Sequence, residues 1–265
     1  MSKADWDKVQ RACRMPLIYR NWRDAFLNRF GPAAADGTVT YILRSGAVFR
    51  MQTGSHDIRV LNEVWLDRVY EPDADFSVRD GWTVLDLGAH KGSFAVRAAL
   101  AGPKTRVHAV EPEPENLRNL NANIALNRLQ NVVVHAAAVS AEPGEALLYV
   151  AGRGSGTNSL FRERIKGDKG VSVAVPTIRL DDLLESAGGQ VDLMKMDVEG
   201  AEYAVLHAVS SKTLRRIHRI VLEYHGVTGL DAEAVRDDVQ RHLQGNGFEC
   251  AAAKDRPLLF ARRRG

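Results

Sequence analysis

Cysteine is nearly absent from this chain, which has only Cys13 and Cys250 among its 265 residues. Two cysteines exclude a disulfide framework and a cysteine-based metal centre, and such low use of cysteine is typical of a reducing compartment. Residues 1–6 include an acidic residue and no apolar signal core, so secretion is not expected. We therefore expect a cytoplasmic protein.

Long hydrophobic runs and an excess of one charge are also missing. No apolar stretch approaches the roughly 18 residues that cross a bilayer, so we expect no membrane partner. The 36 basic and 33 acidic residues leave a formal net charge of only +3, which is too balanced to indicate a nucleic-acid partner. The length suffices for one complete α/β core, and the hydrophobic content of 45% is ordinary for a globular domain.

The most informative segment is residues 84–92, which reads VLDLGAHKG. Its apolar run contains Asp86, breaks into a turn with glycines at positions 88 and 92, and leads into a helical pattern. A strand, a glycine turn and a helix in this order place backbone N–H groups against a nucleotide-like ligand. A second apolar run ends in Glu111, where a carboxylate can accept both hydroxyls of a ribose. Together the two segments indicate a ligand of the adenosine type.

The glycine turn also lacks features that phosphate ligands need. It has no third glycine of the dinucleotide fingerprint, and no G-K-[ST] follows it. Asp86 would repel phosphates, but it can accept hydrogen bonds from a cationic amino-acid tail. S-adenosylmethionine has such a tail, a ribose and no phosphate, so we expect it as the cofactor. The alternatives from other classes are a nucleotide-binding oxidoreductase and an adenosine-binding subunit without catalysis.

From residue 81 onward, strand-like and helix-like segments alternate, which predicts an α/β fold with helices on both faces of a mostly parallel sheet. Strands are expected near residues 82–87, 107–111, 132–136, 146–150, 171–176, 191–196, 218–223, 247–253 and 257–262. Helices are expected near residues 93–101, 114–127, 179–186, 201–208 and 232–245. Residues 81–265 would then form the cofactor-binding domain, and residues 152–159, rich in glycine and serine, would form a flexible loop that either closes over the site or has no role.

Residues 1–80 are expected to form a separate N-terminal part. It would contain a helical arm over 4–30, a β-hairpin over 38–51 that turns at Ser45 and Gly46, and a lead-in helix over 57–70. The arm is rich in large apolar side chains, namely Trp6, Trp22, Phe26 and Phe30. We expect it to cover the acceptor pocket or to form a homodimer contact, with packing onto its own domain as the alternative.

A second motif, residues 191–202, reads VDLMKMDVEGAE. A strand again ends in an acidic residue, Asp197, and is followed by a turn and a helix that begins with more acids. Such residues point into the ligand crevice at the carboxyl ends of parallel strands. Glu199 and Glu202 could instead simply complement the helix N-terminus, but Lys195 and Asp197 need another reason, because charges are rare in a buried strand.

With both motifs in view, the chain resembles the FkbM-type methyltransferases of the class I S-adenosylmethionine-dependent superfamily. The matching residues are 84–92, 110–112, Asn116, Leu120, Asn123, 175–176, 180–183, 195–202 and 222–225, with Glu63 and Tyr70 as the usual lead-in. The resemblance implies a Rossmann-like, seven-stranded, mostly parallel sheet whose last strand is antiparallel. It also implies methyl transfer to a hydroxyl of a small natural product or sugar, with S-adenosylhomocysteine as the second product.

The resemblance carries cofactor contacts over to particular residues. Asp86, Gly88 and Gly92 would form the methionine side, Glu111 would hold the ribose, and Glu63 and Tyr70 would close over the cofactor. Ala89, Asn116 and Asp197 complete the set of expected cofactor-binding residues. The chain departs from the family at His90 and Lys91, where relatives often have Asn and an apolar residue. We expect Lys91 to face solvent or to begin the helix.

Methyl transfer to an alcohol needs in-line approach and a base that takes the acceptor's proton. The candidates are Asp197 and His225, and His225 is favoured because it follows an apolar strand and titrates near neutral pH. Glu223 is expected to orient the imidazole. A magnesium ion that bridges a diol through Asp197, Glu199, Glu223 and His225 is less favoured, because nothing in their spacing demands a metal. Methylation of a nitrogen or carboxyl group on a peptide or protein remains the alternative within the fold, although residues 197–200 read DVEG rather than an Asn/Asp-Pro-Pro-Tyr-like motif.

Overall fold

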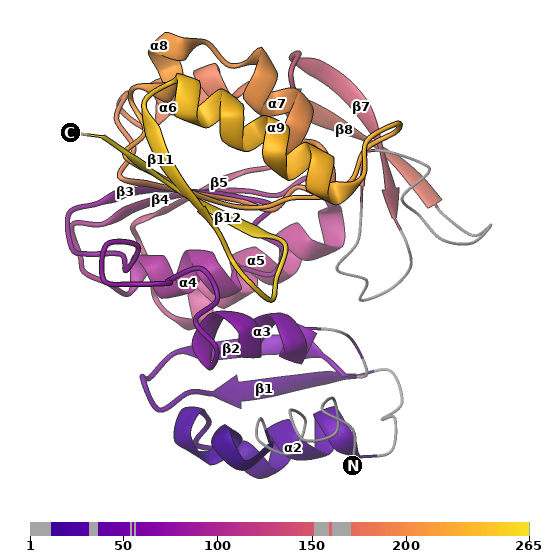
Figure 1. Cartoon of the computed structure of the whole chain (residues 1–265). Coiled ribbons are helices and arrows are strands. Elements are labelled where there is room, and N and C mark those ends of the chain that lie inside the picture. Colours follow the sequence, from indigo (N-terminus) through magenta and orange to yellow (C-terminus); the bar gives the residue numbers. More distant parts are fainter. Residues whose placement is uncertain are drawn as a thin grey trace.

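The computed structural model of the chain describes residues 12–31, 37–53, 55, 57–150, 159–160 and 171–264. A central sheet is covered by helices on both faces, and the N-terminal part packs beneath one helical layer (Figure 1). In chain order the elements are α2 Trp22–Phe30, β1 Thr38–Ile42, β2 Val48–Gln52, α3 Asp57–Trp65, β3 Thr83–Leu87, α4 Ser93–Ala99, β4 Arg106–Val110, α5 Pro114–Leu126, β5 Val132–His135, β6 Ala138–Val139, β7 Gly144–Val150, β8 Val171–Ile178, α6 Leu180–Ser186, β9 Leu193–Met196, α7 Glu202–Ala208, α8 Ser211–Leu214, β10 Arg219–Glu223, α9 Ala232–Gly245, β11 Phe248–Ala252 and β12 Leu258–Arg263.

The central sheet has seven strands in the order β11-β12-β10-β9-β3-β4-β5. The strands from β10 to β5 run parallel, while β12 is antiparallel to both β10 and β11. The structure therefore confirms the expected α/β class I methyltransferase fold, including the antiparallel last strand. The chain runs outward from β3 through β4 to β5 and then returns to the other side of β3 for β9 and β10. Right-handed crossovers in these two directions place α4 and α5 on one face and the later helices on the other.

Both faces of the sheet are buried, which explains why its central strands read as continuous apolar runs. Along β3, Val84 packs into the core beneath α4 and α5, and Leu85 packs into the core beneath α6 to α9. Figure 1 shows these two helical layers on opposite sides of the sheet. Polar side chains can therefore enter only at the strand ends or as buried pairs.

Two of the predicted strands belong to a different sheet. The segments expected near 146–150 and 171–176 are β7 and β8, and they form a three-stranded sheet with the short β6. Their side chains alternate between exposed and partly buried positions, unlike those of the central strands. Residues 152–158, which include most of the predicted loop, lie outside the described residues.

The N-terminal part contains the predicted hairpin, β1 paired antiparallel with β2. In the described residues the predicted helical arm consists of two helices, because the helix over 12–18 ends before Tyr19 and α2 begins at Trp22. Tyr19 is fully buried and its hydroxyl donates to Asn62 Oδ1 at 2.6 Å. Anchoring this side chain on the lead-in helix interrupts the arm. The lead-in helix α3 also ends early, at Trp65 rather than near residue 70.

The hairpin joins the arm to the rest of the molecule. Asn127 Oδ1 accepts a hydrogen bond from Val48 N at 2.9 Å, and Asn123 Oδ1 accepts one from Arg50 N at 2.8 Å. These bonds attach β2 to α5, and one apolar core contains Phe49 together with Val84. The predicted division between residues 80 and 81 therefore crosses a continuous core.

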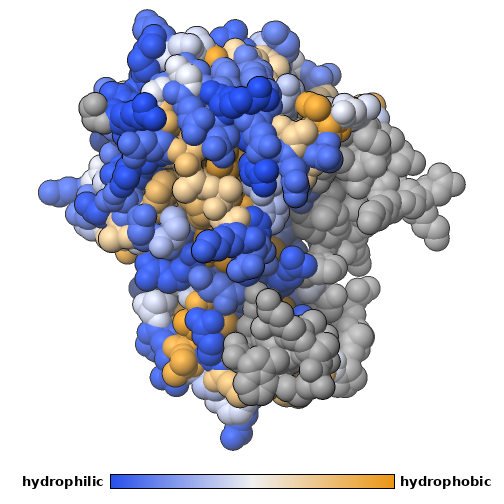
Figure 2. All heavy atoms as spheres, viewed as in Figure 1, coloured by the Kyte–Doolittle hydropathy of each residue, from blue (hydrophilic) through white to orange (hydrophobic). Residues whose placement is uncertain are grey.

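The outer side of the arm keeps several large apolar side chains at the surface. Leu17, Trp22, Phe26, Leu27 and Phe30 are all exposed. Figure 2 shows a mostly hydrophilic face on which apolar side chains form small separate groups, one of them at the end where the hairpin and arm lie. A homodimer contact through this arm stays a prediction. Among the described residues, no helix is both long and apolar enough to cross a membrane.

Candidate active site

A pocket lies at the carboxyl ends of β3, β4 and β9. Parallel strands direct the loops that follow them to this edge of the sheet, so ligands bind there in open α/β folds. Of the predicted cofactor-binding residues, Tyr70, Gly88, Ala89, Glu111, Asn116 and Asp197 line the pocket. Glu63, Asp86 and Gly92 are not part of its wall. The sequence did not indicate the apolar wall formed by Val60 and Val64 of α3 and by Leu148 of β7 in the three-stranded sheet.

The glycine turn after β3 is fastened to the neighbouring strand rather than left open. Gly88 N and Ala89 N both donate to Val110 O, at 3.0 and 2.9 Å, and His90 N donates to Glu111 Oε2 at 2.8 Å. The N–H groups that we expected to face a ligand are thus used inside the protein. A phosphate would find few donors here, so this turn suits a nucleoside better than a dinucleotide.

Glu111 is buried at the pocket wall with its carboxylate held in a fixed orientation. Oε1 accepts hydrogen bonds from Glu113 N at 2.9 Å and Asn116 Nδ2 at 3.3 Å. Burial raises the pKa of Glu111 to about 7, and the hydrogen bonds from Glu113 N, His90 N and Asn116 only partly oppose that rise. A buried carboxylate with spare acceptor capacity beside a cavity is the group that a ribose diol requires.

Because its pKa is near 7, Glu111 should make cofactor binding depend on pH. Only the ionised carboxylate accepts hydrogen bonds from both ribose hydroxyls, so affinity should fall as the pH drops through about 7. We expect the Kd for S-adenosylhomocysteine, measured by calorimetry, to rise roughly tenfold between pH 8 and pH 5.5. Glu111→Gln should bind more weakly and lose this dependence, and a pH profile unchanged by Glu111→Gln would contradict the assignment.

Asp86 lies beneath the pocket rather than in it. Its side chain is fully buried, and Asp86 Oδ1 is 3.2 Å from Lys195 Nζ. Burial raises the pKa of Asp86 although Lys195 acts in the opposite direction. Lys195 Nζ also donates to Gly88 O at 2.8 Å, and its pKa is raised because Asp86 and Asp197 outweigh the effect of burial. The lysine that seemed out of place in a buried strand therefore connects Asp86 to the glycine turn and the pocket.

The expectation that Lys91 faces solvent is wrong. Lys91 is only 1% exposed, and its Nζ lies 2.6 Å from Asp57 Oδ2 at the start of α3. Since a buried ammonium needs a partner, this ion pair fixes α3 against the glycine turn. The neighbouring His90 lines the pocket, and burial lowers its pKa to about 4, so it is neutral near pH 7.

The side chains of Glu63, on α3, and Tyr70, after α3, point to different places. Tyr70 reaches the pocket, where its hydroxyl donates to Asp197 Oδ2 at 3.5 Å and its ring lies 5.6 Å from Lys195 Nζ. Glu63 instead pairs with Arg59 and with Arg256 from the β11–β12 turn, each at 3.2 Å. Glu63 therefore links α3 to the C-terminal strands.

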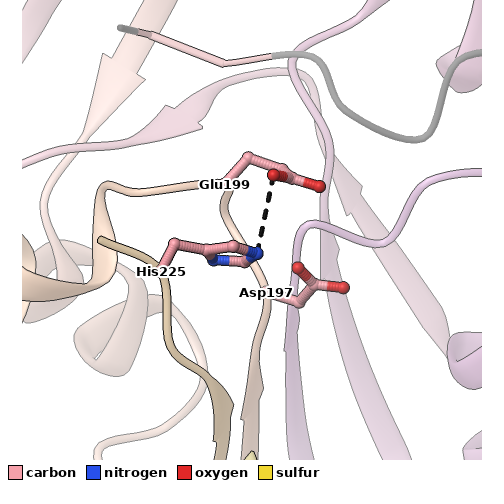
Figure 3. Close-up of side chains that lie close together, drawn as sticks. All are labelled: Asp197, Glu199 and His225. Carbon is pink, nitrogen blue, oxygen red and sulfur yellow. Dashed lines mark ion pairs between the residues drawn. The ribbon is translucent and has the colours of Figure 1, made fainter. Parts of the chain in front are cut away.

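Three side chains converge beside the pocket, at the ends of β9 and β10 (Figure 3). Asp197 and Glu199 lie in the turn after β9, and His225 follows β10. One ligand atom from each lies within 4.8 Å of the others. His225 Nε2 is 3.5 Å from Glu199 Oε2. The structure thus brings together two residues that the sequence named as catalytic, Asp197 and His225.

The imidazole of His225 is oriented by Glu202, not by Glu223 as we expected. His225 Nδ1 lies 3.0 Å from Glu202 Oε1, and Glu202 is fully buried. Glu202 also accepts hydrogen bonds from Val198 N and Gly200 N, at 3.0 and 2.9 Å. One carboxylate therefore shapes the turn that carries Asp197 and positions the histidine. Its place in the KMDVEGAE segment was visible in the sequence, but its two partners were not.

The charges of this group differ from those that we assumed. Burial would lower the pKa of His225, but Glu202, Glu199 and Asp197 raise it to about 9. The imidazole is therefore protonated on both nitrogens and positively charged near pH 7 in this state. Burial and Asp197 raise the pKa of Glu223 to about 7. In this state His225 is a poor proton acceptor, and the carboxylates of Asp197 and Glu223 are better placed for that role.

The family model for the methyltransferase FkbM domain matches residues 86–250, from the strand before the glycine turn to the edge strand β11. The chain belongs to the FkbM methyltransferase family. The enzyme is therefore a methyltransferase, and the FkbM family implies dependence on S-adenosylmethionine.

Individual FkbM relatives and a solved methyltransferase are also similar to this chain. It is 29% identical over 252 residues to 31-O-demethyl-FK506 methyltransferase FkbM of Streptomyces tacrolimicus, covering 85% of this chain and 94% of the relative. It is 26% identical over 216 residues to Methyltransferase 1 of Beauveria bassiana (strain ARSEF 2860), covering 74% and 81%. A solved precorrin-6y C5,15-methyltransferase of Geobacter metallireducens GS-15 gives a TM-score of 0.42 at 17% identity, covering 72% of this chain and 84% of that one.

The pocket of this FkbM methyltransferase fits S-adenosylmethionine. Glu111 offers a buried acceptor for a ribose, and the apolar side chains of Val139 and Leu148 offer a surface for a flat base. Asp197 and Tyr70 are among the polar residues of the wall. These properties match a ligand that combines an apolar base, a diol and a cationic tail.

Proposed function

We propose that this enzyme is an O-methyltransferase that acts on a hydroxyl of a small natural product or sugar. The observation that carries the proposal is the pair of carboxylates that can accept a proton at this edge of the sheet, Asp197 in the pocket wall and its electrostatic neighbour Glu223. A hydroxyl needs a base when it attacks a methyl group, because an alcohol is a weak nucleophile until its proton leaves. The similarity to a relative named for methylation at a hydroxyl oxygen supports the same assignment.

The side chains divide into those that bind the cofactor and those that serve the acceptor. Glu111 and Asn116 would hold the ribose, and Gly88 and Ala89 would pass beside the methionine portion. S-adenosylmethionine, when bound, supplies a methyl group on a sulfonium. The acceptor hydroxyl would approach over Asp197 and Glu223, and one of these two carboxylates would take its proton. Tyr70 would limit the entry of water next to Asp197.

A methyl-transfer assay with two classes of acceptor tests this proposal. The enzyme is incubated with methyl-labelled S-adenosylmethionine and with panels of hydroxylated macrolactones and sugars, or of peptides. We expect labelled methyl ethers from at least one hydroxylated acceptor, with stoichiometric S-adenosylhomocysteine. Label found only on nitrogen or carboxyl groups of peptides would establish the alternative activity and overturn this proposal.

A further inference from the structure

We infer that Asp197, Glu199 and His225 bind a divalent cation of the Mg²⁺ or Mn²⁺ type, and that this ion holds an acceptor through two neighbouring oxygen atoms. The inference rests on the proposed function for the identity of the acceptor, but the cation site itself stands on the geometry of these three side chains. The sequence alone left such an ion as the less favoured hypothesis and included Glu223 among its ligands.

The spacing of the three ligand atoms is slightly wider than that around a single ion. In an octahedral Mg²⁺ site with bonds of about 2.1 Å, neighbouring ligand atoms are about 3.0 Å apart and opposite ones about 4.2 Å apart. His225 Nε2 and Glu199 Oε2 are 3.5 Å apart, and all three ligand atoms lie within 4.8 Å of one another. Figure 3 shows the three side chains facing a common point from two separate loops. Small side-chain rotations would close the site.

The histidine is already oriented as metal-binding histidines are. Because a carboxylate can only accept, His225 Nδ1 carries the proton in its hydrogen bond of 3.0 Å to Glu202. Nε2 is directed at Asp197 and Glu199, and a bound cation would displace the proton that Nε2 carries near pH 7. A buried carboxylate behind a histidine ligand fixes both its tautomer and its ring orientation. An ordinary surface ion pair would not need a second, fully buried carboxylate for this purpose.

The ligand types indicate which ion is bound. Two carboxylates and one imidazole combine hard oxygen donors with one nitrogen, a set that suits Mg²⁺ or Mn²⁺ better than Ca²⁺ or a thiolate-seeking metal. Three protein ligands would leave three of six positions for water or an acceptor, and Asp197 and Glu199 both line the pocket from which an acceptor would arrive. An acceptor with adjacent hydroxyls, or a hydroxyl next to a carbonyl, can fill two of them.

With the ion in place, the proton acceptor is decided by elimination. Asp197 and His225 are occupied as ligands, whereas Glu223 is not one of the three. The oxygen of the acceptor forms its bond to the methyl carbon as the carbon–sulfur bond breaks, and the bonding electron pair stays on sulfur. The proton of the hydroxyl passes to the carboxylate of Glu223. The cation contributes by lowering the pKa of the hydroxyl that it binds.

Binding of Mn²⁺ alone, followed by electron paramagnetic resonance and calorimetry, tests the site without any acceptor. We expect one Mn²⁺ per chain in the metal-stripped wild type. Asp197→Asn and His225→Gln should each weaken binding at least about tenfold. The matched control is His207→Gln, which removes a histidine that pairs with a single carboxylate, Asp238, at 2.9 Å. It should leave Mn²⁺ binding unchanged.

Far-ultraviolet circular dichroism establishes that each variant is folded, and Glu199→Gln provides a third, milder ligand change. Absence of saturable Mn²⁺ binding in the folded wild type, or equal binding in all ligand variants, would overturn the cation site. Labelled methyl ethers formed in the presence of a chelator, without Mn²⁺ binding, would leave the O-methyltransferase proposal intact and reject only the cation. Stoichiometric Mn²⁺ binding together with label on nitrogen alone would support the cation site and overturn the O-methyltransferase proposal.

Discussion

Changing Glu223 to glutamine is expected to lower kcat by about 10²- to 10⁴-fold, the usual contribution of a general base. Affinity for S-adenosylhomocysteine should remain close to that of the wild type, because Glu223 does not line the cofactor pocket. The Glu223 side chain interacts electrostatically with Tyr70, Asp197 and Lys195. Asp197 raises its pKa and Lys195 lowers it, while Glu223 in turn raises the pKa of Tyr70 and of Lys195. Glutamine keeps the shape of the side chain, but its amide replaces one acceptor oxygen with a donor and cannot take a proton.

Steady-state kinetics at saturating acceptor, with calorimetry for the cofactor, separate this role from a structural one. Glu249→Gln on β11 is a suitable control, since it removes a carboxylate that forms only exposed ion pairs with Arg262 and Arg264. Such pairs contribute little, so kcat should not change. If Glu223→Gln retained a nearly normal kcat, proton transfer would have to be reassigned to Asp197.

Gly88→Ala should be the most damaging small substitution in the glycine turn. An added Cβ would lie 1.8 Å from the backbone oxygen of Asp197, and Gly88 has a φ of +76°, which L side chains rarely adopt. Neither backbone segment can move without displacing the ends of β3 and β9. We expect a loss of about 3 kcal/mol or more in the free energy of unfolding, together with loss of cofactor binding.

Gly46→Ala is the matched comparison, because it separates backbone strain from steric overlap. Gly46 also has a positive φ, +96°, but nothing lies within 4 Å of an added Cβ. It should lose only about 1–2 kcal/mol, the ordinary cost of the left-handed conformation. Urea denaturation of both variants measures the difference. Equal losses in the two would show that the contact between Gly88 and Asp197 is not what limits this position.

The order of strands and helices could be predicted because it depends on local pattern. Apolar runs, turn residues and helical periodicity placed α5 and α9 within about one residue of their observed ends. The same logic placed Glu111 at the pocket, since the carboxyl ends of parallel strands share one edge of a sheet. Strand partners are less local. The sequence therefore found β7 and β8, but it could not assign them to a separate sheet.

Contacts between distant segments required the tertiary structure. Lys91 looked like a solvent-facing residue because its partner, Asp57, is 34 positions away, and Glu202 looked like an ordinary helix-start acid because its link to His225 crosses between two strands. Ionisation depends on the same contacts. His225 was expected to be a base, but the carboxylates around it keep its imidazole positively charged near pH 7. The sequence by itself determined the fold and which residue types reach the strand ends, because both follow from periodicity and topology. Only the tertiary structure decided which of those residues meet and what charge each carries, because burial and pairing across the chain set these properties.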